Sequence, residues 1–471
     1  METIETDYLV IGAGAVGLSF ADALLAESSA TMVVVDRRHA PGGHWNDAYP
    51  FVRLHQPSLF YGVASMELGS GRIDDAGPNA GNFELASGPE VVTYFERVMR
   101  ERLLPSGRVR YLPMHDVVST DNGGALVRGR LGGADRKIVV NRKIVDGTYY
   151  NTTIPSTHQR KFDVAPGVDC IAPNDLPRRA PGAGRFVILG GGKTAMDVGV
   201  WLLENGVDPD AVVWVRPRDS WLINRDTTQP TSRFFHQSIG SMATQMEAAV
   251  VATSVDDLFD RLEAADIMLR IDPTTRPEMF HYATISIGEV ELLRRIGDVR
   301  RGARVTRIEP GALAFTDGAR SSTPPGALYI DCTATAVERR PPVPTFNGDR
   351  ITLQMVRLPN PAFSAALAAY VEAHYTDEAE KNRLCAACPL PDSPADWPAA
   401  TVANMMNQYA WNQDKTLRDW ITRCRLDGFG QVVRDADKSD PAQAAVLQRL
   451  KEAIMPAVMN LQRLAAQPDA A

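Results

Sequence analysis

The sequence has few cysteines and no long apolar segment. Its five cysteines are an odd number spread over 471 residues, which fits a reducing compartment better than a disulfide framework. No stretch reaches the roughly 20 apolar residues that a transmembrane helix needs. Acidic residues at Glu2, Glu5 and Asp7 argue against a signal peptide at the start. These absences favour a cytoplasmic protein that has no membrane partner.

An excess of basic charge is also absent. The formal net charge is −7, which argues against nucleic acid as a partner. Cys385-Ala-Ala-Cys388 is the only close cysteine pair, and a zinc site would need a second one, so no metal is expected. With 44% hydrophobic and 23% charged residues, the composition is that of a globular protein. The length predicts about two or three domains.

A glycine-rich turn between two apolar strands lies near the start of the chain. Residues 8–11 predict a buried parallel strand because the run is apolar on both faces. Gly12, Gly14 and Gly17 then give G-x-G-x-x-G, which allows a tight turn, the approach of a pyrophosphate and close helix packing. The next apolar strand ends in Asp36, a carboxylate suited to ribose hydroxyls. This order of elements predicts a dinucleotide site.

A loop with two glycines and a tryptophan follows Asp36. It reads Gly42-Gly43-His44-Trp45 and is followed by Tyr49-Pro50, so the backbone can pass close to a flat ligand beside an aromatic ring. With the first glycine motif and the acid, this loop resembles the FAD domain of class B flavin monooxygenases. That group includes the flavin-containing and the Baeyer–Villiger monooxygenases. The resemblance implies that FAD occupies the first site.

The resemblance also implies which residues would contact FAD. From the turn, the strand end and the loop these are Gly12, Gly14, Gly17, Asp36, Arg37, Gly43 and Trp45. Residues 109–112, 115–119, 125–131 and 137–140 are expected to form a small antiparallel meander that places Val117 or Val118 against the adenine. Residues 144–150 would return to the central sheet, where Asp146-Gly147-Thr148 only loosely matches the family's Ala-Thr-Gly turn.

The opening pattern returns in the second part of the chain. Residues 185–189 predict a strand, a G-x-G-x-x-A turn follows, and the strand 211–215 ends in Arg216-Pro-Arg218 instead of an acid. An arginine binds a 2′-phosphate bidentately, whereas a carboxylate repels it, so this site is predicted to take NADPH. Solvated surface charges are the alternative for both arginines. The predicted cofactor-binding residues are Gly190, Gly192, Lys193, Thr194, Ala195, Arg216 and Arg218.

We therefore expect an α/β fold with two nested Rossmann-like domains, one for FAD and one for NADPH. The expected parts are the first part of the FAD domain (1–160), a linker (161–183), the NADPH domain (184–338) with a helical insertion at about 229–297, and a return to the FAD domain with C-terminal helices (339–471). Helices are predicted at 90–103, 234–253, 255–269, 290–296, 361–374, 411–425 and 442–466, and a strand at 351–357.

Polar residues after Gly43 are the candidates for catalysis. Under the resemblance, NADPH reduces the flavin, and the reduced flavin forms a flavin peroxide with oxygen in a dry pocket that offers hydrogen-bond donors. The candidates for the wall of that pocket are Asn46, Asp47, Arg53, His55 and Gln56. The alternatives are a surface histidine at His55 and a simple ion pair between Asp47 and Arg53. The sequence thus predicts an NADPH-dependent FAD oxidoreductase, first of all a monooxygenase that uses molecular oxygen on a small organic substrate.

The chain departs from the family in two places. The fingerprint Phe-x-Gly-x-x-x-His is expected before the second glycine motif, but His158 is the only histidine there and has no Phe-x-Gly before it. The substrate class therefore stays open. The family's Gly-Asp pair at the return to the FAD domain is matched only by Gly348-Asp349, in an expected exposed turn, so the C-terminal FAD contacts stay unassigned.

Two other functions remain open. A reductase that passes electrons to a thiol pair would use Cys385 and Cys388, although these lie outside both dinucleotide units. A sensor that binds the dinucleotides without catalysis is the third hypothesis, and two cofactor sites argue against it. A homodimer is left open as a further partner.

Overall fold

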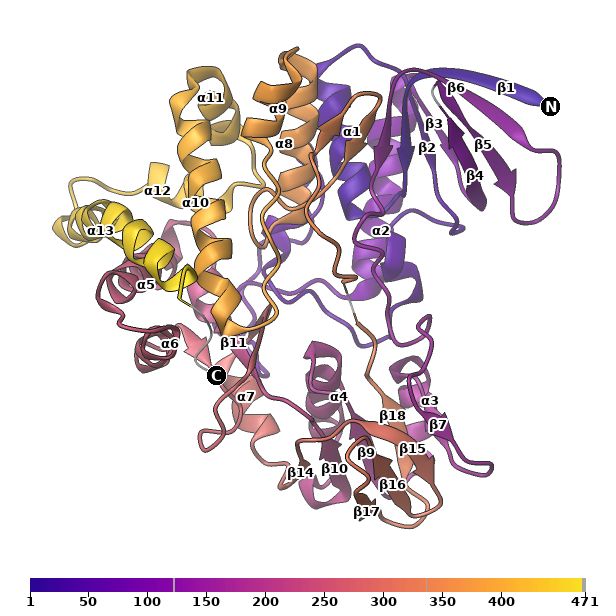
Figure 1. The fold of residues 1–471 in the computed structure, drawn as a ribbon, viewed down its shortest axis with the longest axis vertical. Coiled ribbons are helices and arrows are strands. Elements are labelled where there is room, and N and C mark those ends of the chain that lie inside the picture. The colour runs from indigo at the N-terminus through magenta and orange to yellow at the C-terminus, as the bar shows by residue number, and fades with distance from the viewer. Residues whose placement is uncertain (122, 336, 468–471) are drawn as a thin grey trace.

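In the computed structural model the chain forms two sheet-centred units, an insertion and a group of C-terminal helices (Figure 1). The structure describes residues 1–121, 123–335 and 337–467. The first unit lies at one end of the long axis and the second unit at the other (Figure 1). Three parts of the predicted domains lie outside the described residues: position 122 of the FAD domain, position 336 of the NADPH domain, and positions 468–471 at the end of the C-terminal part.

The first unit is built on a mostly parallel sheet. Its strand order is β19-β20-β6-β1-β2-β3, and the antiparallel hairpin β4–β5 extends it from β6. The turn after β1 and the end of β2 therefore meet at one edge of the sheet, where dinucleotides bind in such folds. The strands are β1 (Glu2–Ile11), β2 (Met32–Val35), β3 (Val109–Leu112), β4 (His115–Asp121), β5 (Gly124–Gly129), β6 (Arg136–Asp146), β19 (Phe346–Asn347) and β20 (Arg350–Thr352).

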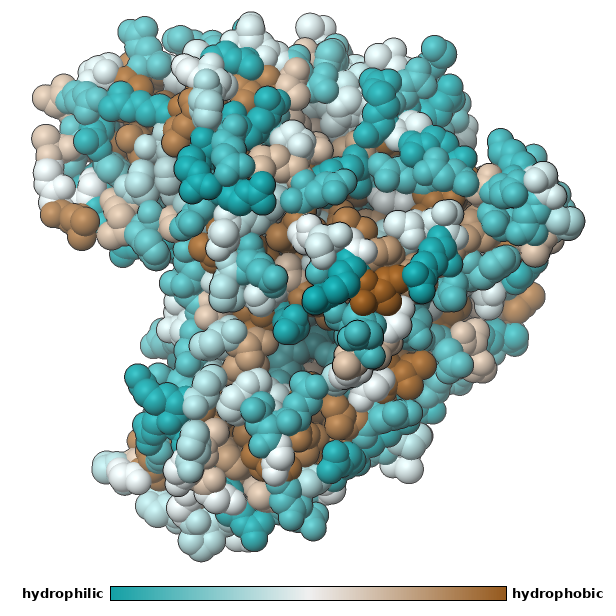
Figure 2. Space-filling view, turned by 180° about the vertical axis from the view of Figure 1, so that it is seen from behind, coloured by the Kyte–Doolittle hydropathy of each residue, from teal (hydrophilic) through white to brown (hydrophobic). Residues whose placement is uncertain are grey.

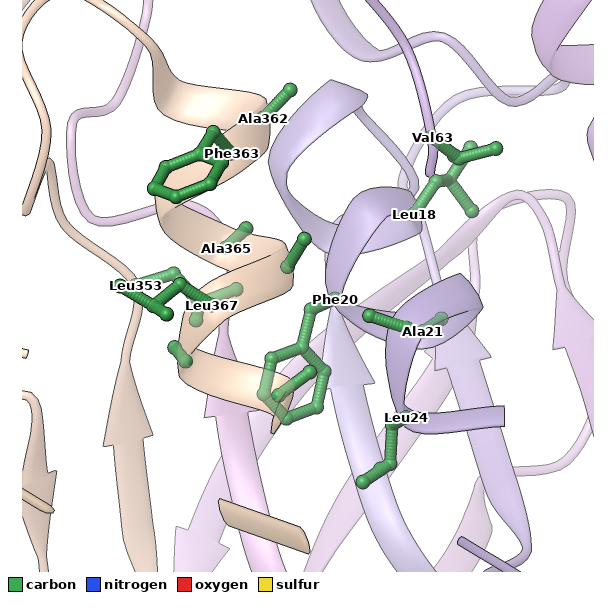
Figure 3. Packing of buried hydrophobic residues seen from close by; sticks show 14 of the residues in the cluster. Leu18, Phe20, Ala21, Leu24, Val63, Leu353, Ala362, Phe363, Ala365 and Leu367 are labelled. Carbon is green, nitrogen blue, oxygen red and sulfur yellow. The ribbon is translucent and has the colours of Figure 1, made fainter. Parts of the chain in front are cut away.

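Two helices from opposite ends of the chain cover this sheet together. α1 (Ala15–Glu27) packs beside α8 (Pro361–His374), and Phe20 of α1 points toward α8 (Figure 3). The many alanines of α8 allow this close approach, and the Ser19 hydroxyl donates to the Ala362 carbonyl at 2.8 Å. The chain thus returns to the first unit after the second, as expected.

The second unit repeats the parallel arrangement. Its sheet has the order β14-β10-β9-β18-β8, with α4 (Lys193–Glu204) on one face and the small sheet β17-β16-β15-β7 on the other. The strands of the large sheet are β8 (Cys170–Ile171), β9 (Phe186–Leu189), β10 (Val212–Val215), β14 (Asp298–Arg300) and β18 (Leu328–Asp331). Those of the small sheet are β7 (Asp163–Val164), β15 (Val305–Glu309), β16 (Ala312–Phe315) and β17 (Arg320–Ser322).

The insertion contains a sheet as well as helices. β11 (Ser220–Asn224) lies between β12 (Met268–Leu269) and β13 (Met279–Ile285), and α5 (Ser241–Val251), α6 (Val255–Ala264) and α7 (Ile287–Leu293) surround them. The prediction of a helical insertion over 229–297 is therefore wrong in part. β12 and β13 pair across the chain with β11, a non-local contact that helical spacing does not register.

The C-terminal helices connect the insertion to the first unit. α13 (Pro441–Ala465) lies along α5 (Figure 1). Trp397 and Leu461 share a buried cluster with Trp221 and Phe259 of the insertion. The helices of this part after α8 are α9 (Glu378–Leu384), α10 (Trp397–Gln413), α11 (Lys415–Arg423), α12 (Gly428–Arg434) and α13.

Several predicted elements have other partners or bounds. Residues 109–112 form β3 at the edge of the parallel sheet, not a meander strand, and 137–140 and 144–146 belong to the single strand β6. The predicted linker 161–183 contains β7, β8 and α3 (Leu176–Arg179), because these short segments pair with or pack on the second unit. The predicted helix 90–103 is present as α2 (Gly88–Arg97) followed by a π-helical segment to Leu103, and the predicted helix 234–253 is present as a π-helical segment from His236 that continues into α5. The remaining differences are helix 255–269 ending as α6 at Ala264, α7 beginning at Ile287, strand 351–357 reduced to β20, and helix 411–425 divided between α10 and α11.

Two connecting segments run side by side between the units. Residues 147–158 lead out of the first sheet, and residues 332–335 and 337–345 lead back. The amide of Glu338 donates to the Tyr150 carbonyl at 2.9 Å, and the Thr153 hydroxyl donates to the Thr335 carbonyl at 2.7 Å. From behind, the surface is notched between the two ends of the molecule (Figure 2). The backbone thus passes between the two units in one paired crossing.

Candidate functional site

The first glycine turn has the geometry of a dinucleotide-binding turn. Gly12 has a φ of +98°, and a Cβ on Gly17 would lie 1.9 Å from the Gly12 carbonyl oxygen, so only glycine fits at Gly17. Gly14 is the N-cap of α1, and among the described residues no side chain caps it. The positive end of α1 is thus available to an anion.

Asp36 folds back onto this turn. Its buried carboxylate accepts from the backbone N–H of Ala13 at 2.6 Å and of Arg38 at 2.7 Å. Each oxygen keeps a further acceptor site, which suits the ribose role predicted for Asp36. Burial and the Asp36 charge raise the pKa of the Tyr111 phenol, whose oxygen is buried without a hydrogen-bond partner in the described part of the chain.

The Gly42-Gly43 loop packs directly on the first turn. A Cβ on Gly43 would lie 2.9 Å from the Gly14 Cα. The Trp45 indole donates to the Tyr61 hydroxyl at 2.7 Å, and the Asn46 amide donates to the carbonyls of Ala40, Pro41 and Gly43. Asn46 thus holds the loop in place beside the predicted flavin site.

The other predicted catalytic residues lie in different surroundings. Asp47 pairs with Arg38 at 2.6 Å, whereas Arg53 is exposed and donates to the Leu85 carbonyl, so the alternative of an ion pair between Asp47 and Arg53 is wrong. Gln56 is half-buried in the same loop. His55 is not a surface histidine, because its imidazole lies near the charged groups at the start of α4.

Predicted cofactor residues at the rim of the first site differ in exposure. Arg37 is exposed after β2, and Val117 is half-buried in β4 while Val118 is exposed. Their predicted roles remain predictions.

The second glycine turn mirrors the first. Gly190 has a φ of +124°, and a Cβ there would lie 2.7 Å from the Cys332 carbonyl oxygen. Gly192 is the N-cap of α4, where no described side chain provides a cap and a Cβ would meet nothing within 4 Å. Lys193, Thr194 and Ala195 form the first turn of α4. This helix start is open to a phosphate group.

Arg216 lies beneath this turn and not at the surface. It is 1% exposed, its guanidinium lies 4.4 Å from the Trp214 ring centroid, and it pairs with Asp219 at 2.8 Å. Burial lowers its pKa to about 10. Arg301 also pairs with Asp219 at 2.7 Å, and Arg218 is exposed. The interpretation of Arg216 as a solvated charge is therefore wrong.

The protein also leaves part of the hydrogen-bonding capacity of Arg216 unused. Its Nε and Nη1 atoms have no hydrogen-bond partner among residues 1–121, 123–335 and 337–467. Its stem packs on the second glycine turn, since a Cβ on Gly191 would lie 3.0 Å from the Arg216 Cγ. A buried, partly unpaired cation under the turn favours an anionic ligand nearby.

A buried cluster of charged groups links the second turn to the first unit. Lys193 pairs with Asp197 and, at 3.1 Å, with Glu289 of α7. Glu289 pairs with Arg225 at 2.7 Å, and Arg225 donates to the His55 carbonyl at 3.0 Å. The sequence pointed to Lys193 and His55 separately; the cluster brings them together.

A tyrosine joins this cluster from the first unit. The Tyr49 hydroxyl donates to Asp197 at 2.6 Å, and burial together with the Asp197 charge raises the Tyr49 pKa well above its ordinary value. The sequence analysis did not select Tyr49, Asp197, Glu289 or Arg225 as site residues. Only the i,i+4 spacing of Lys193 and Asp197 could have suggested a pair.

Protonation in the cluster follows from its charges and burial. Burial opposes the charge of both Glu289 and Lys193, but the opposite charges around them prevail, so the Glu289 pKa is lowered and the Lys193 pKa is raised. Burial and the Lys193 charge lower the His55 pKa to about 4. His55 is therefore neutral at neutral pH, and the charges of the other groups balance.

The two residues of the cysteine pair, Cys385 and Cys388, lie in the packed interior of the protein. All five cysteines are free thiols, and Cys385 and Cys388 are both buried. Burial raises the pKa of both thiols, that of Cys388 to about 12, which disfavours the reactive thiolate. The Cys388 thiol donates to the Val356 carbonyl at 3.4 Å.

His158, the lone histidine of the crossing segment, also has a structural partner. Its Nε2 lies 2.9 Å from Asp331 at the end of β18. Nearby, the Ser156 hydroxyl donates to the Asp47 carbonyl at 2.7 Å. These contacts tie the crossing segment to both units.

Gly348-Asp349 lies in an exposed turn between β19 and β20, as expected. The described residues contain no group of three His, Cys, Asp or Glu side chains that could hold a metal ion. None of the helices in the described ranges is long and apolar enough to cross a membrane.

Proteins similar in sequence to this chain include several from mycobacteria. Residues 10–64 match the family model of the NAD(P)-binding Rossmann-like domain. The uncharacterized protein Rv2000 of Mycobacterium tuberculosis (strain H37Rv) is 49% identical over 426 residues, which cover 90% of this chain and 78% of that protein. A protein of Mycobacterium bovis, the uncharacterized protein Mb2023, matches equally well.

Solved structures with a similar fold include Tmm from Pelagibacter sp. strain HTCC7211. It has a TM-score of 0.50 and 10% identity, and the match covers 89% of each chain. A mutant flavin monooxygenase from Stenotrophomonas maltophilia has a TM-score of 0.48 and 16% identity, and the match covers 80% of this chain and 99% of that one. The predicted fold of two nested Rossmann-like units with a helical C-terminal part is confirmed.

Proposed function

This chain belongs to the family of the mycobacterial protein Rv2000, and from its two dinucleotide sites we propose that it is an FAD- and NADPH-dependent oxidoreductase. More specifically, we propose a monooxygenase that acts on a small organic substrate with molecular oxygen. The NAD(P)-binding Rossmann-like match and the nested fold support FAD and NADPH as the cofactors.

One observation carries the proposal: both glycine turns end in a helix that lacks a side-chain cap, and only the first is covered by a Gly-Gly-x-Trp loop. Among the described helices, α2 and α7 have complete capping boxes, whereas α5, α10 and α12 also lack a side-chain cap, so the position of α1 and α4 after a glycine turn is what distinguishes them. Two uncapped starts at the carboxyl ends of two parallel sheets fit two phosphate-bearing ligands. The loop at Gly43 supports the proposal that the first site is the flavin site.

The residues of the first site fit FAD. The N–H groups at the start of α1 would bind the pyrophosphate, Asp36 the ribose, and Gly43 would let the backbone lie close to the ligand. When bound, FAD supplies electron transfer and reaction with oxygen, which side chains cannot supply. The side chains bind, orient and exclude water.

In this proposal the aromatic residues beside the Gly42-Gly43 loop exclude water from the first site. Trp45 donates to Tyr61, and the Tyr61 ring packs on Phe95 in the core. Burial raises the Tyr61 pKa, so the phenol keeps its proton at Oη and remains a donor at neutral pH. A neutral His55 adds no charge to the pocket wall.

The second site fits NADPH through its arginines. Arg218 is exposed where the 2′-phosphate of a dinucleotide would lie beyond β10, and Arg216 and Arg301 add positive charge beside it. Asp219 holds both Arg216 and Arg301 in place. We propose that Arg218 contacts the phosphate and that Arg216 supports the site from below.

The test uses the purified full-length protein. It should carry FAD, anaerobic NADPH should bleach the flavin absorbance, and oxygen should restore it. With a substrate, label from ¹⁸O₂ should enter the product. A colourless protein that takes up no FAD would overturn the proposal, and reduction without oxygen consumption would favour a reductase that serves another acceptor.

A further inference from the structure

A chain of four groups connects the start of α4 with the loop of the first unit. It runs from Lys193 at the second glycine turn, through Glu289 of α7 and Arg225 of the 3₁₀ turn Arg225–Thr228, to the carbonyl oxygen of His55. Each link is 2.7–3.1 Å long. The chain therefore passes through the second unit, the insertion and the first unit.

Glu289 is the centre of this chain. One carboxylate oxygen faces Lys193, and the other lies 2.7 Å from Arg225 and accepts from the Ser286 backbone N–H at 2.8 Å. The side chain is 11% exposed. A carboxylate that is nearly out of water and meets two cations is held in one orientation, because each partner would otherwise be a buried, unbalanced charge.

Arg225 extends the chain into the first unit. It is 1% exposed, and besides the His55 carbonyl it donates to the Asn79 side chain at 3.1 Å. The neighbouring Gln229 accepts from the Phe83 backbone N–H at 2.9 Å. The insertion thus holds the backbone of the first unit at His55 and at the loop around Asn79.

We propose that Glu289 is a positioning residue that aligns the second dinucleotide site with the His55 loop by acting through Lys193 and Arg225. The identity of the ligand, NADPH, rests on the proposed function. The positioning role itself rests only on the observed contacts. Without the Glu289 charge, Lys193 keeps only Asp197, its neighbour on the same helix, and the second site loses its link through Arg225 to the His55 loop.

The first test is Glu289→Gln. Glutamine retains the acceptor that caps α7 at Ser286, so the capping box survives while the charge is lost. Glu90→Gln is the matched control, because Glu90 occupies the same position in the capping box of α2 at Ser87 and has no part in the cluster. Calorimetric binding of NADP⁺ to the FAD-loaded protein should weaken about tenfold in Glu289→Gln and stay unchanged in Glu90→Gln.

A second readout does not depend on any cofactor. Amide hydrogen exchange in residues 54–58 should accelerate in Glu289→Gln but not in Glu90→Gln, while exchange in β1 and β2 stays at the wild-type rate. If wild-type protein binds no NADP⁺, the proposed function fails, and this exchange experiment alone decides the positioning role. Unchanged exchange in residues 54–58 would overturn it.

A double-mutant cycle separates positioning from general support. If Glu289 acts through Lys193, then Lys193→Gln combined with Glu289→Gln should weaken NADP⁺ binding no more than the worse single variant. Additive losses, or tighter NADP⁺ binding in Glu289→Gln, would refute the proposal. Should Glu289→Gln not fold, Arg225→Lys leaves the α7 cap untouched and should give the same change in hydrogen exchange.

Discussion

Gly43 lies against Gly14, so closely that a Cβ on Gly43 would come within 2.9 Å of the Gly14 Cα. The two glycines come from the Gly42-Gly43 loop and the first glycine turn, and their contact fixes the loop at the start of α1. Both the missing side chain and the positive φ of Gly43, +59°, are needed for this contact.

The Gly43→Ala variant should therefore lose most of the bound FAD. The backbone strain alone is worth about 1 kcal/mol, and the methyl group would also push the loop off the turn. The FAD-to-protein absorbance ratio measures the loss. Gly71→Ala is the control, because Gly71 has a similar φ of +71° and no atom within 4 Å of its Cβ. Equal FAD content in both variants would contradict the contact.

Arg218 and Arg216 should respond differently to substitution. Arg218→Ala removes an exposed charge and should raise the KM for NADPH about tenfold with little change for NADH, because only NADPH carries the 2′-phosphate. Arg216→Met removes half of a buried ion pair and should lower the free energy of unfolding by about 3 kcal/mol. Steady-state kinetics and denaturant unfolding measure these effects. A rise in KM for NADPH only with Arg216→Met would assign the phosphate to Arg216.

The lowered pKa of His55 leads us to expect that the protein loses stability in mild acid. The folded pKa of His55, about 4, lies below its ordinary value of 6.5, so between these pH values the unfolded chain binds a proton that the folded chain does not. Stability therefore falls as the pH drops from 7 to about 4.5, and His55→Gln should reduce this fall by about 2 kcal/mol. Urea unfolding at both pH values measures it. His39→Gln, at an exposed position, serves as the control.

Cys385→Ser and Cys388→Ser should leave NADPH-dependent flavin reduction and turnover intact. Both thiols are buried, and their raised pKa values disfavour the thiolate. Some loss of stability is expected because a hydroxyl replaces a buried sulfur. Anaerobic reduction and oxygen consumption are the measurements. Loss of turnover with intact flavin reduction would restore the thiol-reductase hypothesis.

The features that sequence predicts well here are local. Gly12, Gly17 and Gly190 lie in turns whose backbone angles or tight contacts select glycine, and the bounds of α8 were predicted to the residue. The strand with which a segment pairs is not determined locally. Residues 109–112 would show the same alternation of apolar and polar side chains in a meander as at the edge of a parallel sheet. Only the pairing with β2 decides between them.

The charged cluster could not be predicted for the same reason. Glu289 lies 96 residues from Lys193 in the chain, and His55 lies 170 residues from Arg225. A single charged residue in a sequence is most often solvated. What makes Glu289 and Arg225 part of a site is burial beside opposite charge, a property of the folded chain alone.

The packing of α13 along α5 changes how the two units can move. If the paired crossing at Tyr150 and Glu338 were the only connection, the second unit could rotate about it relative to the first unit. Here the insertion also packs on α13, which contacts α10, and α10 is connected through α9 to α8 of the first unit, so the two units have a second connection. Any widening of the space between the two dinucleotide sites must either bend the insertion or slide α13 along α5.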